Sequence, residues 1–469
     1  MATYKTPDVY VEEIAVFPPS IAEVETAIPA FIGYTEKARK NADKDLVLKP
    51  LKIYSFKEYE YYFGLPRTDE ITLTISDDIA GGFTVDSFTE PSLEYILYYS
   101  VKMFFANGGG QCYIISVGTY QDIPSIALAG DGGSDPATKY GLQDGLDRLA
   151  MEDEPTLIVI PEAVQLVEAD YTTLVQAVLA QCDSLKDRFA IFDIYSGETV
   201  LDADAQADNR GYFGNNYLKY GAAYYPFQKT TINFYVDEAE SNVKVTYDGT
   251  EQDLSSLKTG NTSAYNAAKN ILKEHFVVLP PSGSVAGVYA ATDSKRGVWK
   301  APANVSLANV IEPVVKIDNI KQAEFNIDAT SGKSINAIRA FAGKGTLVWG
   351  ARTLSGNDNE WRYISVRRFY NMVEESVKKS TYWAVFEPND ANTWVKVRGM
   401  IENYLVQKWR EGALAGASPK DAFFVRCGLG TTMTFQDILE GRMFVEIGMA
   451  VVRPAEFIIL KFSHKMQTS

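Results

Sequence analysis

The chain has 469 residues, of which 46% are hydrophobic and 22% are charged, and its formal net charge is −15 at pH 7. This length allows two or three domains with sizeable cores, and the acidic balance argues against nucleic acid as a partner. No apolar stretch approaches the ~18 residues that a membrane-spanning helix requires, so we expect no direct membrane insertion.

The amino-terminal stretch M-A-T-Y-K-T-P-D-V-Y-V-E-E-I lacks the basic start and apolar core of a secretory signal. We therefore expect cytoplasmic assembly without a signal peptide, with any later export by another route. Cys112, Cys182 and Cys427 lie far apart in the sequence and give neither a disulfide framework nor a metal-binding spacing.

The charge is unevenly distributed along the chain. Residues 344–469 contain 17 Lys and Arg against 13 Asp and Glu, a net charge of +4, whereas the rest of the chain carries −19. Two interpretations stay open. The basic C-terminal third either faces an acidic protein surface or consists of solvated faces without a partner.

The first elements follow from turn, cap and strand patterns. Tyr4 to Glu25 has short strand-like pieces and no helical periodicity, which predicts an extended arm. Ile28 to Thr35 predicts the first buried strand. Ser55 to Glu58 forms a capping box that opens a short aromatic helix ending at Gly64. The polar stretch from Pro66 to Pro91 predicts a loop with a hairpin.

Strand and helix patterns then alternate. We expect helices from Ser92, as the cap, to Ala106, from Leu142 to Met151 and from Tyr171 to Lys186, and strands over Gln111–Val117, Thr156–Pro161 and Phe189–Ile194. This alternation predicts a largely parallel sheet with helices on its faces.

The pattern changes twice further along the chain. Gln228 to Thr262 predicts a β-rich insertion with a tight turn at Asp248-Gly249. After Gly343 the pattern is that of an α+β domain. The expected elements there are helices over Tyr363–Ala384, Thr393–Glu411 and Phe435–Glu440, and strands over Ala422–Cys427 and Met443–Val451.

The last expected element is an apolar strand from Phe457 to Phe462, buried on both faces. Arg453-Pro454 separates it from the preceding strand. Because proline cannot donate to a ladder, we expect the chain to leave its own sheet there.

Catalytic patterns are scarce. The two histidines, His275 and His464, have no G-x-S-x-G serine to form a triad with. S-G-K-S at Ser331 lacks the first glycine of a phosphate loop, and G-L-G-T-T-M at Gly428 reads as a tight turn. The carboxylates near Asp202 lack the glycine and glutamate of a calcium loop and predict a solvated loop. We expect no catalytic, cofactor or metal site.

Four basic residues remain as candidates for contact with a partner: Arg367, Arg368, Lys378 and Lys379. Alternatively they lie on a solvated helix face and pair with Glu374 and Glu375.

Several motifs resemble one family. K-T-P-D-V-Y-V-E-E-I at Lys5 and A-I-P-A-F-I-G-Y-T at Ala27 resemble the start of contractile tail sheath proteins. The stretch from Pro280 to Asn304 is similar to the family's central signature. W-R-Y-I-S-V-R-R-F-Y-N-M-V-E-E-S, F-E-P-N-D-A-N-T-W and R-P-A-E-F-I-I-L-K-F resemble its C-terminal half. The resemblance is greatest to the sheaths of phage-tail-like contractile injection systems.

The resemblance implies a structural protein that works without a cofactor. Sheath subunits form stacked hexameric rings around an inner tube, and their terminal arms cross to neighbouring subunits and complete small β-sheets there. The implied partners are the chain itself, sheath paralogues where the particle has them, the inner tube protein, and baseplate and terminal cap proteins. The resulting particle would be either released or membrane-anchored.

We therefore expect a mixed α/β and α+β, multi-domain fold. The expected parts are an N-terminal arm (1–25), a central α/β domain (26–343) with a β-rich insertion (228–262), an inner, tube-facing α+β domain (344–452) and a C-terminal strand arm (453–469). The arm residues are Val9, Tyr10, Val11, Ile14, Phe457, Ile458, Ile459, Leu460 and Phe462, and the hinges are Pro18, Pro19, Arg453 and Pro454. The alternative is an α/β nucleotide-binding protein or enzyme, suggested by the strand–helix alternation alone.

Overall fold

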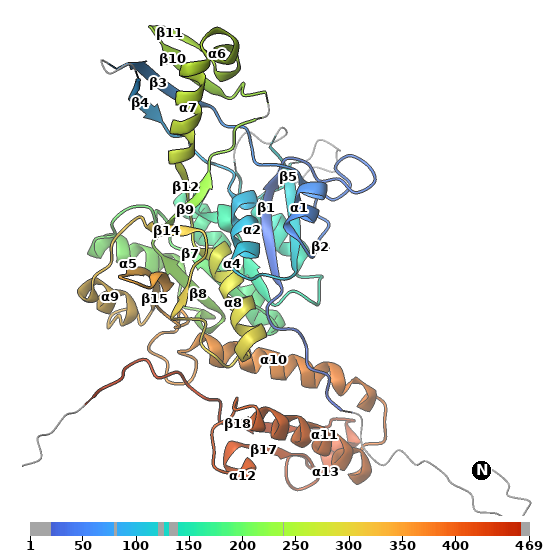
Figure 1. The fold of residues 1–469 in the computed structure, drawn as a ribbon. Helices are drawn as coiled ribbons and strands as arrows, with labels where there is room; N and C mark the ends of the chain where they lie inside the picture. Colours follow the sequence, from blue (N-terminus) through green and yellow to red (C-terminus); the bar gives the residue numbers. More distant parts are fainter. Residues whose placement is uncertain (1–19, 79–81, 121–125, 131–138, 238, 461–469) are drawn as a thin grey trace, which may run out of the picture. The chain divides into compact units, whose positions relative to one another are not determined.

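Figure 1 shows the computed structural model of the chain, which describes residues 20–78, 82–120, 126–130, 139–237 and 239–460. These residues divide into two compact units. Of the described residues, those at 20–24 and 372–452 form the small unit, and those between 25 and 371 and between 453 and 460 form the central unit. The expected arm residues Val9, Tyr10, Val11 and Ile14 and the expected hinge Pro18-Pro19 lie outside the described residues.

The strands in the described part of the central unit are β1 (Pro29–Thr35), β2 (Leu51–Ile53), β3 (Ile71–Asp77), β4 (Phe83–Thr89), β5 (Cys112–Thr119), β6 (Leu157–Val159), β7 (Phe189–Asp193), β8 (Gly221–Tyr225), β9 (Gln228–Asn233), β10 (Val243–Tyr247), β11 (Thr250–Asp253), β12 (Phe276–Leu279), β13 (Val305–Ser306), β14 (Val310–Pro313), β15 (Ile335–Phe341) and β16 (Gly345–Val348). Its helices are α1 (Phe56–Phe63), α2 (Leu97–Ala106), α3 (Leu142–Leu149), α4 (Glu168–Leu185), α5 (Ala203–Tyr212), α6 (Leu254–Gly260), α7 (Thr262–Glu274), α8 (Ser282–Arg296), α9 (Asn319–Asn326) and the 3₁₀ helices η1 (Pro161–Gln165) and η2 (Leu218–Tyr220).

Helix α10 (Ile364–Ser380) begins in the central unit and ends in the small unit. The small unit then adds η3 (Tyr382–Ala384), α11 (Ala391–Arg410), α12 (Pro419–Ala422), β17 (Phe423–Arg426), α13 (Phe435–Leu439) and β18 (Glu446–Met449). Strands β17 and β18 pair antiparallel in a two-stranded sheet.

A nine-stranded sheet organises the central unit, in the order β13-β16-β15-β8-β7-β6-β1-β5-β2. The six strands from β15 to β5 in this order pair in parallel, which confirms the predicted parallel sheet. Side chains alternate between two separate cores. Phe31 of β1 packs on the side of α2 and α8, whereas Ala30 and Ile32 pack on the side of α3 and α4. Both faces of the sheet are therefore buried.

The expected domain boundary after Gly343 falls inside this sheet. Strands β15 and β16 form an antiparallel hairpin around Gly343, and Gly343 and Gly345 turn the chain with φ of 73° and 78°. The chain thus remains in the central unit until Asn371.

Two segments far apart in sequence build one sheet. Strands β3 and β4 form the predicted hairpin, and β10 and β11 form the hairpin expected at Asp248-Gly249, where both residues have positive φ. Strand β3 then pairs in parallel with β10, with Leu73 opposite Val245. The four strands form a separate sheet with the order β11-β10-β3-β4. Figure 1 shows α6 and α7 beside this sheet.

The predicted start of α2 at Ser92 is wrong. The helix begins at Leu97, and the backbone N–H groups of Ile96 and Leu97 each donate to Oε1 of Glu162, at 3.1 Å. The other carboxylate oxygen accepts from the backbone N–H of Tyr34, at 2.9 Å. The buried carboxylate of Glu162, in η1 just after β6, therefore satisfies donors that a helix-terminal side chain usually serves.

Helix α8 has the same kind of remote cap. No side chain at Pro281 caps it, and the backbone N–H of Ser282 donates to Oδ1 of Asp193, at 2.8 Å. Asp193 is the last residue of β7. Two helices that pack on one face of the sheet are thus each held at the N-terminus by a carboxylate from a neighbouring strand end.

Helices α2 and α8 approach each other closely through glycines of α8. A Cβ atom added at Gly287 would lie 2.5 Å from the carbonyl oxygen of Phe104, and one at Gly283 would lie 2.5 Å from that of Ser100. Because both contacts are with backbone atoms of α2, a side chain at either position would require the helices to move apart.

The structure corrects the prediction for the polar stretch at Asp202 and supports the predicted helix start at Ser55. The stretch at Asp202 is not a solvated loop: Asp202 accepts from the backbone N–H of Ala205 and opens α5. Asp202 is the N-cap of this helix and Asp204 lies in its first turn, where acidic side chains are favoured. Ser55 caps α1 as predicted, accepting from the backbone N–H of Glu58, but the Glu58 carboxylate accepts from the N–H of Tyr54 and not from that of Ser55 as in a full capping box. The end of α1 at Gly64, with φ of 87°, is confirmed.

Replacing Gly287 by Ala should destabilise the central unit by about 1–3 kcal/mol, because the new methyl group overlaps the backbone of α2. Gly211 is the matched control, since it lies in α5 and a Cβ atom there would meet nothing within 4 Å. Urea unfolding followed by circular dichroism measures both variants. A Gly287→Ala variant as stable as Gly211→Ala would contradict the proposed close contact.

Burial raises the pKa of Glu162 to about 8, against the lowering effect of its three backbone N–H donors. Since the folded state holds the proton more tightly than the unfolded chain, the contribution of Glu162 to stability is complete at pH values below about 4.5 and is lost as the pH rises toward 8.

We therefore expect Glu162→Gln to flatten the pH dependence of the urea midpoint between pH 5 and about 8, while lowering stability at every pH because the amide cannot accept all three bonds. Glu198→Gln, at an exposed position, is the control. An unchanged pH profile in Glu162→Gln would exclude titration of this carboxyl in that range.

Candidate interaction surfaces and anchor points

The described end of the N-terminal segment is fastened to α10. The backbone N–H groups of Ala22 and Val24 donate to the hydroxyls of Ser380 and Ser376, both at 3.1 Å. Two residues of extended chain span ~6.6 Å and four helical residues ~6 Å, so the two spacings match. Residues 22–24 therefore run antiparallel to the end of α10, and helix hydroxyls replace a neighbouring strand as hydrogen-bond partners.

The residue between these two, Glu23, is held by an ion pair. Glu23 forms an ion pair with Lys408 of α11, which is only 3% exposed and also contacts Glu411 at 2.6 Å. The basic side chain of Lys408 is thus occupied within the small unit.

Arg368 fastens the next part of the segment within the central unit. Its guanidinium donates to Asp293 of α8, with Nη1–Oδ1 at 3.0 Å, and to the carbonyl oxygen of Thr26 at 2.9 Å. The Thr26 hydroxyl donates to the same carboxylate at 2.6 Å, and the guanidinium lies over the ring of Tyr289 at 4.7 Å. Arg368 is 3% exposed, so this is a buried ion pair with further hydrogen bonds.

Arg367 is also buried, at 2% exposure. Its guanidinium lies 4.3 Å from the ring centre of Trp361 and 5.1 Å from that of Tyr220, and its Nε donates to Asn371 at 2.7 Å. Contact of Arg367 or Arg368 with a partner through solvent-facing charge is therefore excluded in this fold. The sequence pattern placed both on a helix surface, but the part of α10 that belongs to the central unit packs both side chains against other residues of that unit.

Lys378 and Lys379 are the two candidates that stay accessible, with side chains 64% and 38% exposed. Both pair with Glu375 one helical turn earlier, at 3.4 Å and 3.2 Å. These are the helix-surface pairs of the alternative interpretation, and such pairs stabilise a helix only weakly.

The basic character of the C-terminal third is not a property of the small unit. Residues 344–371, 372–452 and 453–469 carry net charges of +3, −1 and +2. The first stretch includes Arg352, Arg367 and Arg368, which are all at most 3% exposed. Of the two interpretations left open, the basic surface loses support, because most of the positive excess is buried or lies in the terminal segment.

The C-terminal segment is extended but forms no strand within the described residues. Phe457, Ile458, Ile459 and Leu460 are 66–79% exposed. The predicted burial on both faces is thus absent in the isolated chain, because none of its own described strands pairs with this segment. Phe462 lies outside the described residues.

One residue of this segment is firmly held. Glu456 accepts from Arg352, with Nη2–Oε2 at 2.6 Å, from Asn326 at 2.7 Å and from Tyr363 at 3.3 Å. Burial raises the pKa of Glu456, but the hydrogen bonds from Arg352 and Asn326 outweigh it and leave the pKa below its usual value. The expected hinge residues Arg453 and Pro454 lie just before this contact, where the chain passes from the small unit to the central unit.

The segment borders a groove of about 610 Å³ in the central unit. Pro454 to Ile458 form one side of this groove, and its other walls include Lys300, Gln322, Arg339 and Trp349. Arg339 is engaged, because it donates to Asn319 and Gln322.

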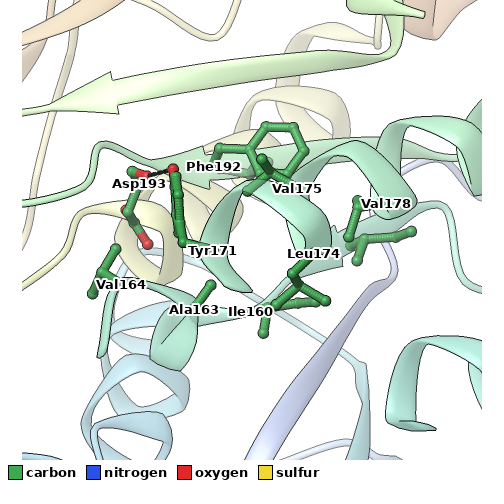
Figure 2. A pocket seen from close by; sticks show the side chains of 11 residues that line it. Ile160, Ala163, Val164, Tyr171, Leu174, Val175, Val178, Phe192 and Asp193 are labelled. Carbon is green, nitrogen blue, oxygen red and sulfur yellow. Dashed lines mark hydrogen bonds between the residues drawn. The ribbon is translucent and has the colours of Figure 1, made fainter. Parts of the chain in front are cut away.

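A second, enclosed space lies between α4, η1 and the strands β6 and β7. Figure 2 shows its apolar walls and the Tyr171 hydroxyl, which donates to the carbonyl oxygen of Asp193 at 2.7 Å. The space amounts to about 10 Å³, which is room for about one water molecule. It is an imperfection of core packing, too small for a substrate.

The lysine of the phosphate-loop-like motif makes a hydrogen bond within the fold. Lys333 of S-G-K-S is 3% exposed and donates from Nζ to the carbonyl oxygen of Arg210 at 2.7 Å. The motif at Gly428 is a tight turn as predicted, with the N–H of Thr431 donating to the carbonyl oxygen of Gly428. His275 caps the C-terminal end of α7, and its ring stacks on Phe88.

Among the described residues, no group of three or more His, Cys, Asp or Glu side chains is arranged to hold a metal ion. None of the helices in the described part of the chain is both long and apolar enough to cross a membrane.

Sequence comparison matches two family models to this chain. The model of the phage tail sheath protein central domain matches residues 136–354, and that of the phage tail sheath C-terminal domain matches residues 356–465. The tail sheath protein of Enterobacteria phage T4 is 26% identical over 127 residues, which are 27% of this chain. That match spans only 19% of the length of the T4 protein.

Structural comparison extends the likeness to the whole chain. The sheath complex of an extracellular contractile injection system, PVC, in its contracted state is 29% identical, with 99% of each chain covered and a TM-score of 0.64. The helical sheath of the anti-feeding prophage (AFP) in its contracted state is 31% identical, with 99% of this chain and 100% of the AFP chain covered and a TM-score of 0.65. The chain therefore belongs to the phage tail sheath protein family, as a contractile sheath subunit.

Proposed function

We propose that this chain polymerises as stacked hexameric rings around an inner tube and that the resulting sheath shortens to drive the tube through a target envelope. The observation that carries the proposal is the likeness, over 99% of the chain, to sheath structures in the contracted state. In this role the chain acts by changing its contacts with other subunits and catalyses no reaction.

The exposed apolar run Phe457–Leu460 supports a role in assembly. Four consecutive large apolar side chains that are 66–79% exposed are unfavourable in a subunit that stays alone. Addition of this segment as a strand to a neighbouring subunit's sheet would satisfy its backbone groups and cover its side chains. Residues Val9 to Ile14 would form the corresponding arm at the other end.

A contact of this kind propagates along a helix because it joins different surfaces of successive subunits. The partners that we propose are other copies of the chain, sheath paralogues where present, the inner tube, and baseplate and terminal cap proteins. Residues 372–452 with their flanks would form the inner part of the sheath and the central unit its outer part. The particle would assemble in the cytoplasm and then be released or anchored at a membrane.

The alternative, an α/β nucleotide-binding protein or enzyme, has no comparable support. It rests on the strand–helix alternation, and fold alone does not imply such a function. The one lysine in a phosphate-loop-like motif, Lys333, is buried and bound to a carbonyl oxygen.

Removal of Phe457–Ser469 should leave a folded subunit that forms no sheaths, because the contact between subunits is lost. The point variant Ile458→Ser/Ile459→Ser should reduce assembly in the same direction. Ile320→Ser is the matched control, since Ile320 on α9 is 73% exposed against 78% and 79% for the other two. Negative-stain microscopy counts sheaths and measures their lengths. Long, abundant sheaths from the truncated chain would overturn the proposed assembly role.

Lys378 and Lys379 are the remaining candidates for contact with the tube. If they contact an acidic tube surface, Lys378→Glu/Lys379→Glu should weaken co-sedimentation of sheath with tubes at low salt, and high salt should reduce the difference from the unaltered chain. Lys420→Glu, at an exposed position of α12, is the control. Equal co-sedimentation of the double variant and the control at low salt would identify both lysines as solvated surface residues.

A further inference from the structure

The root of the C-terminal segment is held by a carboxylate clamp. Oxygen Oε2 of Glu456 accepts from Nη2 of Arg352 at 2.6 Å, and Oε1 accepts from its Nε at 3.0 Å. The side-chain amide of Asn326 donates to Oε1 at 2.7 Å, and the Tyr363 hydroxyl donates to Oε2 at 3.3 Å. Donors from three places in the central unit therefore converge on a single carboxylate, with the paired geometry that makes Arg–carboxylate contacts strong.

Arg352 is also held in position by hydrogen bonds that do not involve Glu456. Its Nη1 donates to the carbonyl oxygens of Asn326 and Gly356, at 3.3 Å and 3.2 Å. The side chain of Asn336, in β15, binds both backbone groups of Arg352: its oxygen accepts from the N–H at 2.9 Å and its amide donates to the carbonyl oxygen at 2.8 Å. The clamp is thus built on an interior strand of the nine-stranded sheet.

The clamp is buried on the arginine side and accessible on the glutamate side. Arg352 is 3% exposed, whereas the Glu456 side chain is 23% exposed. Loss of the carboxylate would leave a buried guanidinium without its main partner, which is unfavourable. Displacement of Glu456 therefore costs more free energy than displacement of its neighbours in the segment.

The residues on either side of Glu456 are held less tightly. Arg453 and Ala455 before it are exposed, and Phe457 to Leu460 after it are 66–79% exposed. Pro454 to Ile458 are among the residues that line the groove beside the clamp. The tightly bound position is a single residue within an otherwise exposed stretch.

We propose that the Arg352–Glu456 clamp is the fixed root of the C-terminal arm. Residues up to Glu456 stay with their own subunit, and the part that crosses to a neighbour begins at Phe457. Arg453-Pro454 is then a linker between the end of the small unit and the clamp, and the joint about which the arm swings lies after Glu456. This inference rests on the proposed exchange of arms between subunits.

A fixed root matters for assembly because it limits the volume that the arm can search. An arm held at Glu456 presents Phe457 and its neighbours from one place on the central unit, so less conformational freedom is lost when the strand binds. An arm released from the clamp would start at Val452 and would sample more positions, which lowers its effective concentration at the neighbouring sheet. Glu456 is a positioning residue in this scheme, and Phe457 onward makes the contact.

The clamp itself can be tested in the unassembled subunit. A nitroxide label at Ala455→Cys should be restricted and one at Leu460→Cys more mobile, and Glu456→Ala should free the label at residue 455. Labelling is selective because Cys112, Cys182 and Cys427 are buried. Electron paramagnetic resonance line shapes report both positions. A label at residue 455 that is equally mobile with and without Glu456 would overturn the fixed root.

The effect on assembly is tested with full-length variants. Glu456→Ala should reduce the yield of sheaths about tenfold or more, as expected for loss of a charged hydrogen-bonded contact. Glu456→Gln should give an intermediate yield because its amide oxygen can still accept from Arg352. Glu312→Ala, at an exposed position of β14, is the control. Because the buried Arg352 loses its main partner, Glu456→Ala should unfold at a lower temperature than the control. A circular dichroism spectrum equal to that of the control at the assembly temperature shows that the loss of sheaths is not a loss of folding.

The outcomes separate this inference from the proposed function. If the chain that lacks Phe457–Ser469 fails to assemble but Glu456→Ala assembles as well as the control, the arm exchange holds and the clamp has no role in it. If the truncated chain assembles, the arm exchange itself is wrong. If Arg352→Lys, which keeps the charge but not the paired geometry, lowers the yield as Glu456→Gln does, the clamp is supported independently of changes at Glu456.

Discussion

Burial of both faces of the parallel sheet dictates most of the central unit. Helices must cover each face, and on one face α2 and α8 come so close that Gly283 and Gly287 contact the backbone of α2. Helix N-termini in such a place have no water to bind their N–H groups. The carboxylates of Glu162, in η1 just after β6, and of Asp193, at the end of β7, take that role. Because the sheet is covered on both sides, these two buried carboxylates replace water as the acceptors for the helix N–H groups.

The two terminal segments present the same problem of unpaired backbone groups and solve it differently. Residues 22–24 bind the hydroxyls of Ser376 and Ser380 on one side and place Glu23 on Lys408 on the other. The C-terminal segment is fixed at Glu456 and leaves Phe457 to Leu460 exposed. One segment is thus satisfied inside the subunit, and the other retains unpaired apolar and backbone groups that suit contact with another chain.

Charge inside this protein serves mainly to fasten segments together. Arg368 joins Asp293 to Thr26, Arg367 lies among aromatic rings, and Arg352 holds Glu456. Arginine suits these places because its planar group makes several directed hydrogen bonds and stacks on aromatic rings. A cluster of basic residues in a sequence accordingly gives no direct measure of a basic surface, as the net charges of +3, −1 and +2 along the C-terminal third show.

Local patterns were sufficient for much of the fold. The alternation of apolar strands and amphipathic helices predicted the parallel sheet, the Asp248-Gly249 pair predicted a hairpin, and the capping box at Ser55 predicted α1, because each of these depends on neighbours in sequence. The motifs of the chain also pointed to the sheath family, to which it belongs.

Contacts between residues far apart in the sequence could not be predicted from local patterns. The pairing of β3 with β10, the capping of α2 by Glu162, and the burial of Arg367 and Arg368 each join residues more than 60 positions apart. An apolar run such as Phe457–Leu460 looks the same in sequence whether it fills a core or remains exposed. Whether such a run is buried depends on which other part of the protein packs against it. In this chain no described strand pairs with the run, whereas Arg352 binds the neighbouring Glu456.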